Sequence, residues 1–147
     1  MYDILHRVGI IASPEDVFAA LTTIDGLAGW WTEDTKGEVD DVIEFRFATA
    51  GGEGFDMKVL ETTPGKLVRW EVVGGPDEWI GTHVGFELSQ TDEYTIVLFK
   101  QEGWREPVEF MYHCSTKWAT FLMSLKQLVE TGTGAPHPRD VQISNWH

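Results

Sequence analysis

Four neighbouring side chains at residues 113–118 are the best candidates for chemistry. His113 and Lys117 are four residues apart and so share one side of a helix, with Cys114 and Trp118 beside them. His113 can donate or accept a proton near physiological pH, or it can lie at the rim of a buried face without a chemical role. Cys114 falls on an apolar stripe, where we expect a buried, unreactive thiol rather than a nucleophile.

The motifs of the common catalytic and metal sites are absent. The five histidines, at positions 6, 83, 113, 137 and 147, show no paired spacing suited to a metal. No GxSxG, P-loop or GxGxxG motif adjoins a strand-to-helix step, and no carboxylate is singled out by an apolar setting. The sequence therefore predicts no catalytic residue, metal site or cofactor, and leaves open whether the protein is an enzyme.

Aromatic residues are unusually numerous, with seven Trp and eight Phe. Their large rings can line a cavity or fill an aromatic core. The apolar candidates for a pocket, by period and position, are Trp30, Trp31, Phe45, Phe47, Phe55, Met57, Trp70, Phe86, Phe99, Trp118 and Phe121. His113 and Lys117 would orient a ligand. Such a site would bind a mainly apolar or aromatic small molecule by burial, and plain core packing is the alternative for each apolar member.

One long helix is predicted at residues 110–131, because apolar residues recur there at spacings of three and four. Gly132 and Pro136 follow it as stop signals. We expect residues 113–121 to face any pocket and residues 125–129 to belong to the structural core.

The remaining elements read as strands around a short helical segment. Residues 3–12 predict a strand, and Ser13 and Pro14 then start a short helix as N-cap and first residue. A turn or second short helix leads to Trp30 and Trp31, whose rings we expect to point in different directions. Alternating segments follow at residues 42–47, 55–59, 67–73, 81–89 and 94–101.

These elements predict an α+β helix-grip fold in one domain, residues 1–147. A curved antiparallel sheet wraps around the long C-terminal helix, short helices follow the first strand, and a cavity remains between sheet and helix. Both faces of the last strand are partly apolar, so the inward face is undetermined. If Ile96 and Leu98 face outward, they suggest a dimer surface, and the protein is either a monomer or a homodimer.

Charge and composition limit the kinds of partner that we expect the protein to bind. The formal net charge is −13 and the pI is near 4.6, which disfavours nucleic acid and anionic membrane surfaces. A single cysteine excludes an internal disulfide and fits a reducing compartment. We find no signal-peptide pattern and no apolar run of membrane-spanning length. The sequence therefore predicts a cytoplasmic protein without membrane insertion.

Several stretches in this order resemble a known superfamily. They are IASPEDVF at residues 11–18, GWW at 29–31, TPGKLVRW at 63–70, and the segment from Lys117 to Gly132 with GAPHP at 134–138. The whole chain is similar to START-like (Bet v 1-like, SRPBCC) proteins, in particular to the branch resembling the C-terminal domain of the Hsp90 ATPase activator.

The resemblance implies a helix-grip fold with a pocket, and members include hydrophobic-ligand carriers, polyketide cyclases and a co-chaperone domain. Three functions follow as hypotheses. The first is binding of a small hydrophobic or aromatic molecule. The second is an enzyme of the polyketide cyclase or hydrolase type that uses the same pocket, with His113 moving a proton. The third is an interaction module that contacts Hsp90.

Overall fold

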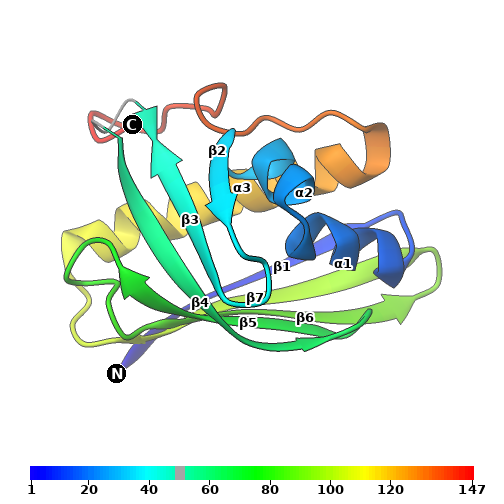
Figure 1. Cartoon of the computed structure of the whole chain (residues 1–147), viewed down its shortest axis with the longest axis horizontal. Helices are drawn as coiled ribbons and strands as arrows, with labels where there is room; N and C mark the ends of the chain where they lie inside the picture. The colour runs from blue at the N-terminus through cyan, green and yellow to red at the C-terminus, as the bar shows by residue number, and fades with distance from the viewer. Residues whose placement is uncertain (49–51) are drawn as a thin grey trace.

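The computed structural model describes residues 1–48 and 52–147, which form one sheet, two short helices and one long helix (Figure 1). In chain order the elements are β1 (Tyr2–Ile10), α1 (Pro14–Thr22), α2 (Ile24–Trp30), β2 (Asp34–Gly37), β3 (Val42–Phe47), β4 (Glu53–Thr63), β5 (Leu67–Gly74), β6 (His83–Thr91), β7 (Tyr94–Trp104) and α3 (Glu109–Thr131).

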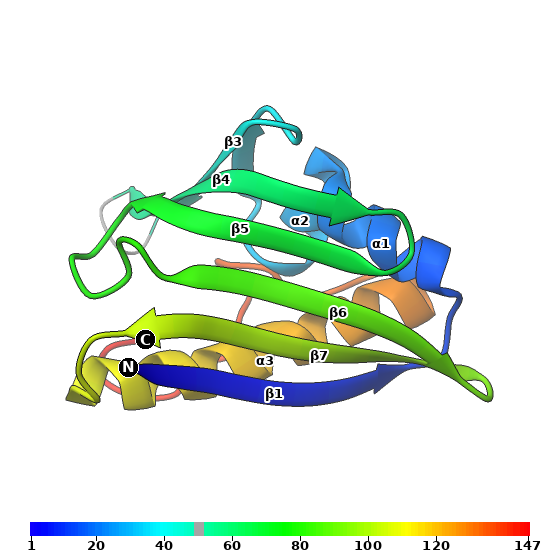
Figure 2. The same cartoon turned by 90° about the horizontal axis from the view of Figure 1, so that it is seen from below.

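The sheet is antiparallel throughout, with the strand order β1-β7-β6-β5-β4-β3-β2. Strands β2 to β7 lie in the sheet in the order of the chain, whereas β1 pairs with β7, so that the first strand lies beside the last. Figure 2 shows this order, with α3 lying along β1 and β7 behind the sheet. The predicted α+β helix-grip fold is confirmed.

Local signals set the helix boundaries. The Ser13 hydroxyl accepts a hydrogen bond from the Asp16 amide at 3.1 Å, and Pro14 opens α1. The Thr23 hydroxyl caps α2 in the same way through the Gly26 amide, at 3.0 Å. Helix α3 ends at Gly132, whose φ of 89° lies in the left-handed region that glycine adopts without strain. The segment after Trp31 continues into β2, a short strand that the sequence pattern did not separate.

The core lies between the concave face of the sheet and the apolar stripe of α3. Cys114, Trp118, Phe121, Leu122 and Leu125 are the apolar residues of α3 that are buried. In β7 the inward residues are Thr95, Val97, Phe99 and Gln101, while Leu98 points outward with 44% of its surface exposed. The inward face of the last strand, left open by its sequence, is thus determined.

A buried hydrogen-bond circuit ties α3 to the sheet. Trp118 Nε1 donates to Gln101 Oε1 at 2.9 Å, and Gln101 Nε2 donates to the Thr82 hydroxyl at 3.0 Å. That hydroxyl donates to the Trp79 carbonyl at 2.7 Å. Trp79 Nε1 donates in turn to Cys114 Sγ on α3, at 3.3 Å. The circuit therefore fixes the β5–β6 loop against one turn of α3.

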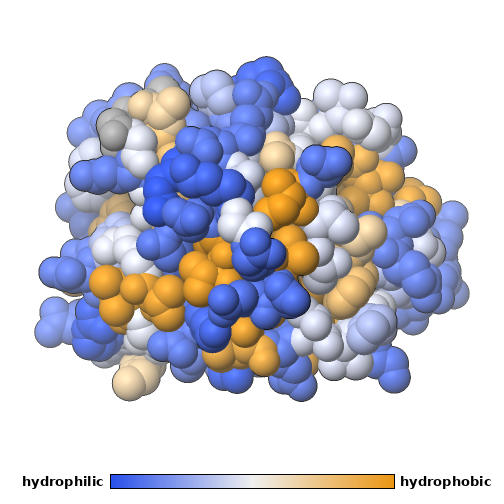
Figure 3. All heavy atoms as spheres, viewed as in Figure 1, coloured by the Kyte–Doolittle hydropathy of each residue, from blue (hydrophilic) through white to orange (hydrophobic). Residues whose placement is uncertain are grey.

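The surface seen in Figure 3 is mixed in polarity. Hydrophilic side chains cover much of the face in Figure 3, and apolar groups show between them. Within the described residues, no helix combines the length and the apolar character that a membrane crossing requires.

We predict that Gln101→Met destabilises the protein. Methionine has a similar volume, but it leaves the Trp118 N–H without its acceptor and removes the donor to Thr82, both in the core. An unsatisfied buried polar group costs about 1–3 kcal/mol, so urea unfolding at pH 7 should show a loss of about 2 kcal/mol or more.

The control is Gln90→Met, at an exposed position of β6, which should change the free energy of unfolding by less than about 0.5 kcal/mol. A Gln101→Met variant as stable as this control would mean that the circuit contributes no stability.

Candidate functional site

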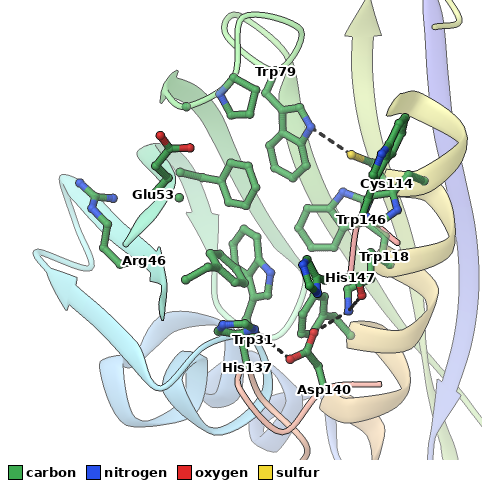
Figure 4. Close-up of a pocket in the computed structure, with 18 of the residues that line it drawn as sticks. Trp31, Arg46, Glu53, Trp79, Cys114, Trp118, His137, Asp140, Trp146 and His147 are labelled. Carbon is green, nitrogen blue, oxygen red and sulfur yellow. Dashed lines mark hydrogen bonds and ion pairs between the residues drawn. The ribbon is translucent and has the colours of Figure 1, made fainter. Parts of the chain in front are cut away.

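A pocket of about 690 Å³ lies between the sheet and the first half of α3 (Figure 4). Small-molecule sites commonly have volumes of about 300–1,000 Å³, so this space suits a ligand of modest size. Four parts of the chain wall it: the β3–β4 hairpin, the β5–β6 loop, α3, and residues 136–147, which we call the C-terminal strap. Trp31 lies at its base.

Seven of the thirteen predicted site residues line this pocket. They are Trp31, Phe47, Phe55, His113, Lys117, Trp118 and Phe121. Strands β3 and β4 place Phe47 and Phe55 on the concave face, because alternate residues of a strand share one face. The helical spacing of α3 directs His113, Lys117, Trp118 and Phe121 toward them, and Trp31 is the C-cap residue of α2.

The other six predicted residues do not line the pocket. Trp30, Phe45, Met57, Trp70, Phe86 and Phe99 are buried in the layer beneath it. Trp31 covers part of this layer, since its ring centre lies 4.2 Å from that of Phe45 and 6.2 Å from the parallel ring of Trp70. The hydrophobic periodicity of a strand or helix identifies residues that point inward, but it does not show whether such a residue lies in this lower layer or in the cavity wall.

The expected divergence of Trp30 and Trp31 was wrong. Their rings are nearly parallel, with an angle of 10° and a centre separation of 5.9 Å. Trp30 is anchored by a hydrogen bond from its Nε1 to the Ala20 carbonyl at 2.9 Å, and Trp31 is the residue where α2 ends. The two rings therefore stack, with Trp31 on the pocket side and Trp30 in the layer beneath it.

The β5–β6 loop supplies Trp79, a wall residue that the sequence analysis missed. Its ring stacks on Phe55 at 3.9 Å and 11°, and lies 5.8 Å from Trp118. It follows a Gly-Gly-Pro-Asp break with no periodic pattern around it. The only available signal was an isolated Trp in a polar loop, where an exposed indole would be unusual.

The C-terminal strap forms the remaining wall and was also missed. Lys117 Nζ donates to Asp140 Oδ2 at 2.5 Å, to the Val141 carbonyl at 2.8 Å and to the His147 carbonyl at 3.1 Å. The Trp146 ring then packs edge-on against His113 at 5.7 Å. The strap contains no helix or strand, so hydrophobic periodicity could not reveal it.

The start of the strap is fixed by main-chain bonds. The His137 amide donates to the Trp31 carbonyl at 2.8 Å, and the Glu33 amide donates to the His137 carbonyl at 3.0 Å. The His137 ring is also within 2.9 Å of Asp140. Asp140 thus lies between His137 and Lys117, and it links the strap to α3.

The titratable groups of the pocket do not form a nucleophile and base pair. Burial raises the pKa of the Cys114 thiol to about 12, which leaves it protonated at neutral pH. Burial, assisted by the charges of Lys117 and His147, lowers the pKa of His113 from its ordinary 6.5, so its imidazole is uncharged at pH 7. Among the described residues, no three His, Cys, Asp or Glu side chains are grouped so as to hold a metal ion.

Comparisons with known proteins agree with this architecture. The family model described as activator of Hsp90 ATPase homolog 1-like protein matches residues 11–130. The solution structure of the Aha1 dimer from Colwellia psychrerythraea is 46% identical, with a TM-score of 0.82, and the match covers 91% of this chain and 100% of that chain.

More distant structures share the fold. A protein from Staphylococcus saprophyticus is 16% identical with a TM-score of 0.73, over 90% of this chain and 95% of that one. A protein from Mesorhizobium loti is 22% identical with a TM-score of 0.72, over 87% of this chain and 96% of that one. No curated protein gave a significant match. The chain therefore belongs to the activator of Hsp90 ATPase homolog 1-like family, within the START-like (Bet v 1-like, SRPBCC) superfamily.

Proposed function

We propose that this protein, a single domain of residues 1–147, binds a small hydrophobic or aromatic molecule between its sheet and α3. The observation that carries the proposal is the aromatic pocket of about 690 Å³. Aromatic rings from the sheet, the β5–β6 loop and α3 face one another across it (Figure 4). Removing an apolar ligand from water against such walls is the main source of affinity.

The walls are held in place before a ligand arrives. Trp118 and Trp79 belong to the buried hydrogen-bond circuit, and the three acceptors around Lys117 hold the strap. A pocket whose side chains are already ordered loses little conformational entropy on binding. These contacts favour a binding role, because they supply shape and apolar surface.

The test is the affinity of Phe47→Ala for a neutral fluorescent probe, N-phenyl-1-naphthylamine. Phe47 is only partly buried, and its ring contacts Trp31, Phe55 and Phe121, so the variant removes wall surface without emptying the deep core. We expect the Kd to rise by roughly tenfold, which corresponds to about 1.4 kcal/mol.

Leu60→Ala is the matched control. It removes a similar apolar group from β4 at a position that is 42% exposed and outside the pocket, so its Kd should equal that of the parent. Equal Kd values for Phe47→Ala and the parent would show that the probe does not bind at the aromatic walls.

Contact with Hsp90 is the second candidate function. It is favoured by the name of the family whose model matches residues 11–130, and by the 46% identity to Aha1 of Colwellia psychrerythraea. We expect the purified protein to raise the ATPase rate of Hsp90, measured at saturating protein with bovine serum albumin as the control. An unchanged rate would exclude this candidate.

We also propose that the protein forms a homodimer, because the relative with 46% identity is described as a dimer. Leu98 on the outer face of β7 is 44% exposed, and Leu5 on the paired strand β1 is 66% exposed. Light scattering should give twice the chain mass of 16.6 kDa, and Leu98→Glu should reduce it to that of one chain. A parent protein of single mass would refute the dimer, whereas a dimeric Leu98→Glu would place the contact elsewhere.

A further inference from the structure

We propose that the pocket selects flat aromatic molecules that are uncharged or positively charged, and that it discriminates against carboxylates and sulfonates. This inference rests on the proposed binding function and specifies the chemistry of its ligand. It depends on three features of the pocket: the orientation of its rings, the pairing of its cations and the position of Glu53.

The rings of the wall are close to parallel. Phe55 makes an angle of 12° with Trp31 and of 11° with Trp79, and Trp79 makes an angle of 21° with Trp118. A flat aromatic ligand can stack on rings that share an orientation, whereas a flexible alkyl chain gains only burial from them. The negative faces of these rings also attract a cation and repel an anion.

The pocket lining contains one arginine, Arg46, and one lysine, Lys117, and each is already paired with an acidic side chain. Arg46 Nη1 lies 2.8 Å from Asp56 Oδ1, and its Nη2 lies 3.2 Å from Glu44 Oε1. All three protons of the Lys117 ammonium have acceptors in the strap. An anionic ligand would have to displace one of these partners to gain a counter-ion.

The remaining charge on the lining is negative. Glu53 stands at the mouth on the first residue of β4, and no ion pair to it is found within residues 1–48 and 52–147 (Figure 4). The net charge of −13 adds a long-range field of the same sign. The imidazole of His113, uncharged at pH 7, offers a hydrogen bond to a neutral polar group.

The experiment compares two probes that differ by one sulfonate. They are N-phenyl-1-naphthylamine, which is neutral, and 8-anilinonaphthalene-1-sulfonate; acridine orange serves as a flat cation. At low salt we expect the sulfonate to bind roughly tenfold more weakly than the neutral probe, because it brings an unpaired charge to aromatic walls. Acridine orange should bind at least as tightly as the neutral probe, and less so at high salt.

Glu53→Lys tests whether charge causes this preference. It should tighten binding of the sulfonate several-fold and weaken binding of acridine orange, and its effect on the neutral probe should be smaller than on either charged probe. Glu93→Lys makes the same change in net charge in the β6–β7 turn, at the end of those strands away from the β5–β6 loop, and should have little effect (Figure 1).

The inference is overturned if the parent binds the sulfonate as tightly as the neutral probe, or if both lysine variants shift sulfonate binding equally. Either result leaves the proposed binding function intact. If none of the three probes binds, the binding function itself fails, and this inference fails with it.

Discussion

A buried polar group must keep a hydrogen-bond partner, and this requirement determines where α3 lies. Gln101 is fully buried on the concave face of the sheet, where its amide needs both a donor and an acceptor. Trp118 and Thr82 satisfy it, and the Thr82 hydroxyl donates in turn to the Trp79 carbonyl in the β5–β6 loop. Shifting α3 by one turn would leave these groups unpaired. Apolar contacts alone would allow α3 to slide along the sheet, whereas the hydrogen-bond circuit allows one position of the helix.

The cavity arises because α3 packs closely on its neighbours near its C-terminus but not in its first half. Near its C-terminus the approach is close: a Cβ on Gly29 would lie 3.0 Å from Leu128 Cδ2, and one on Gly134 would lie 2.4 Å from the Gly29 carbonyl oxygen. Glycines there let α2 and the segment just before the strap pack directly on the helix. In the first half of α3, large indoles keep helix and sheet apart. Rigid rings cannot fill a curved space completely, so a pocket remains between them.

The fold was predictable from sequence, whereas only part of the site was. Strand period placed Phe47 and Phe55 inward, and helix period placed Trp118 and Phe121 opposite them, because each pattern reports which face is buried. Trp79 and Trp146 belong to segments without period, and their positions depend on single hydrogen bonds or ring contacts between residues distant in sequence. The separation of Trp31 from Trp70 into two layers depends on packing depth, to which a pattern of alternation is insensitive.

The strap that completes the pocket lies beyond residue 130, where the match to the family model ends. It is attached by hydrogen bonds to Trp31, Glu33 and Lys117 and by the contact of Trp146 with His113, and it contributes no residue to the sheet or to α3. A substitution in the strap can therefore change the chemistry of one wall without altering a strand or α3. The match to the family model therefore does not define the chemistry of this wall, which His137, Asp140, Trp146 and His147 supply.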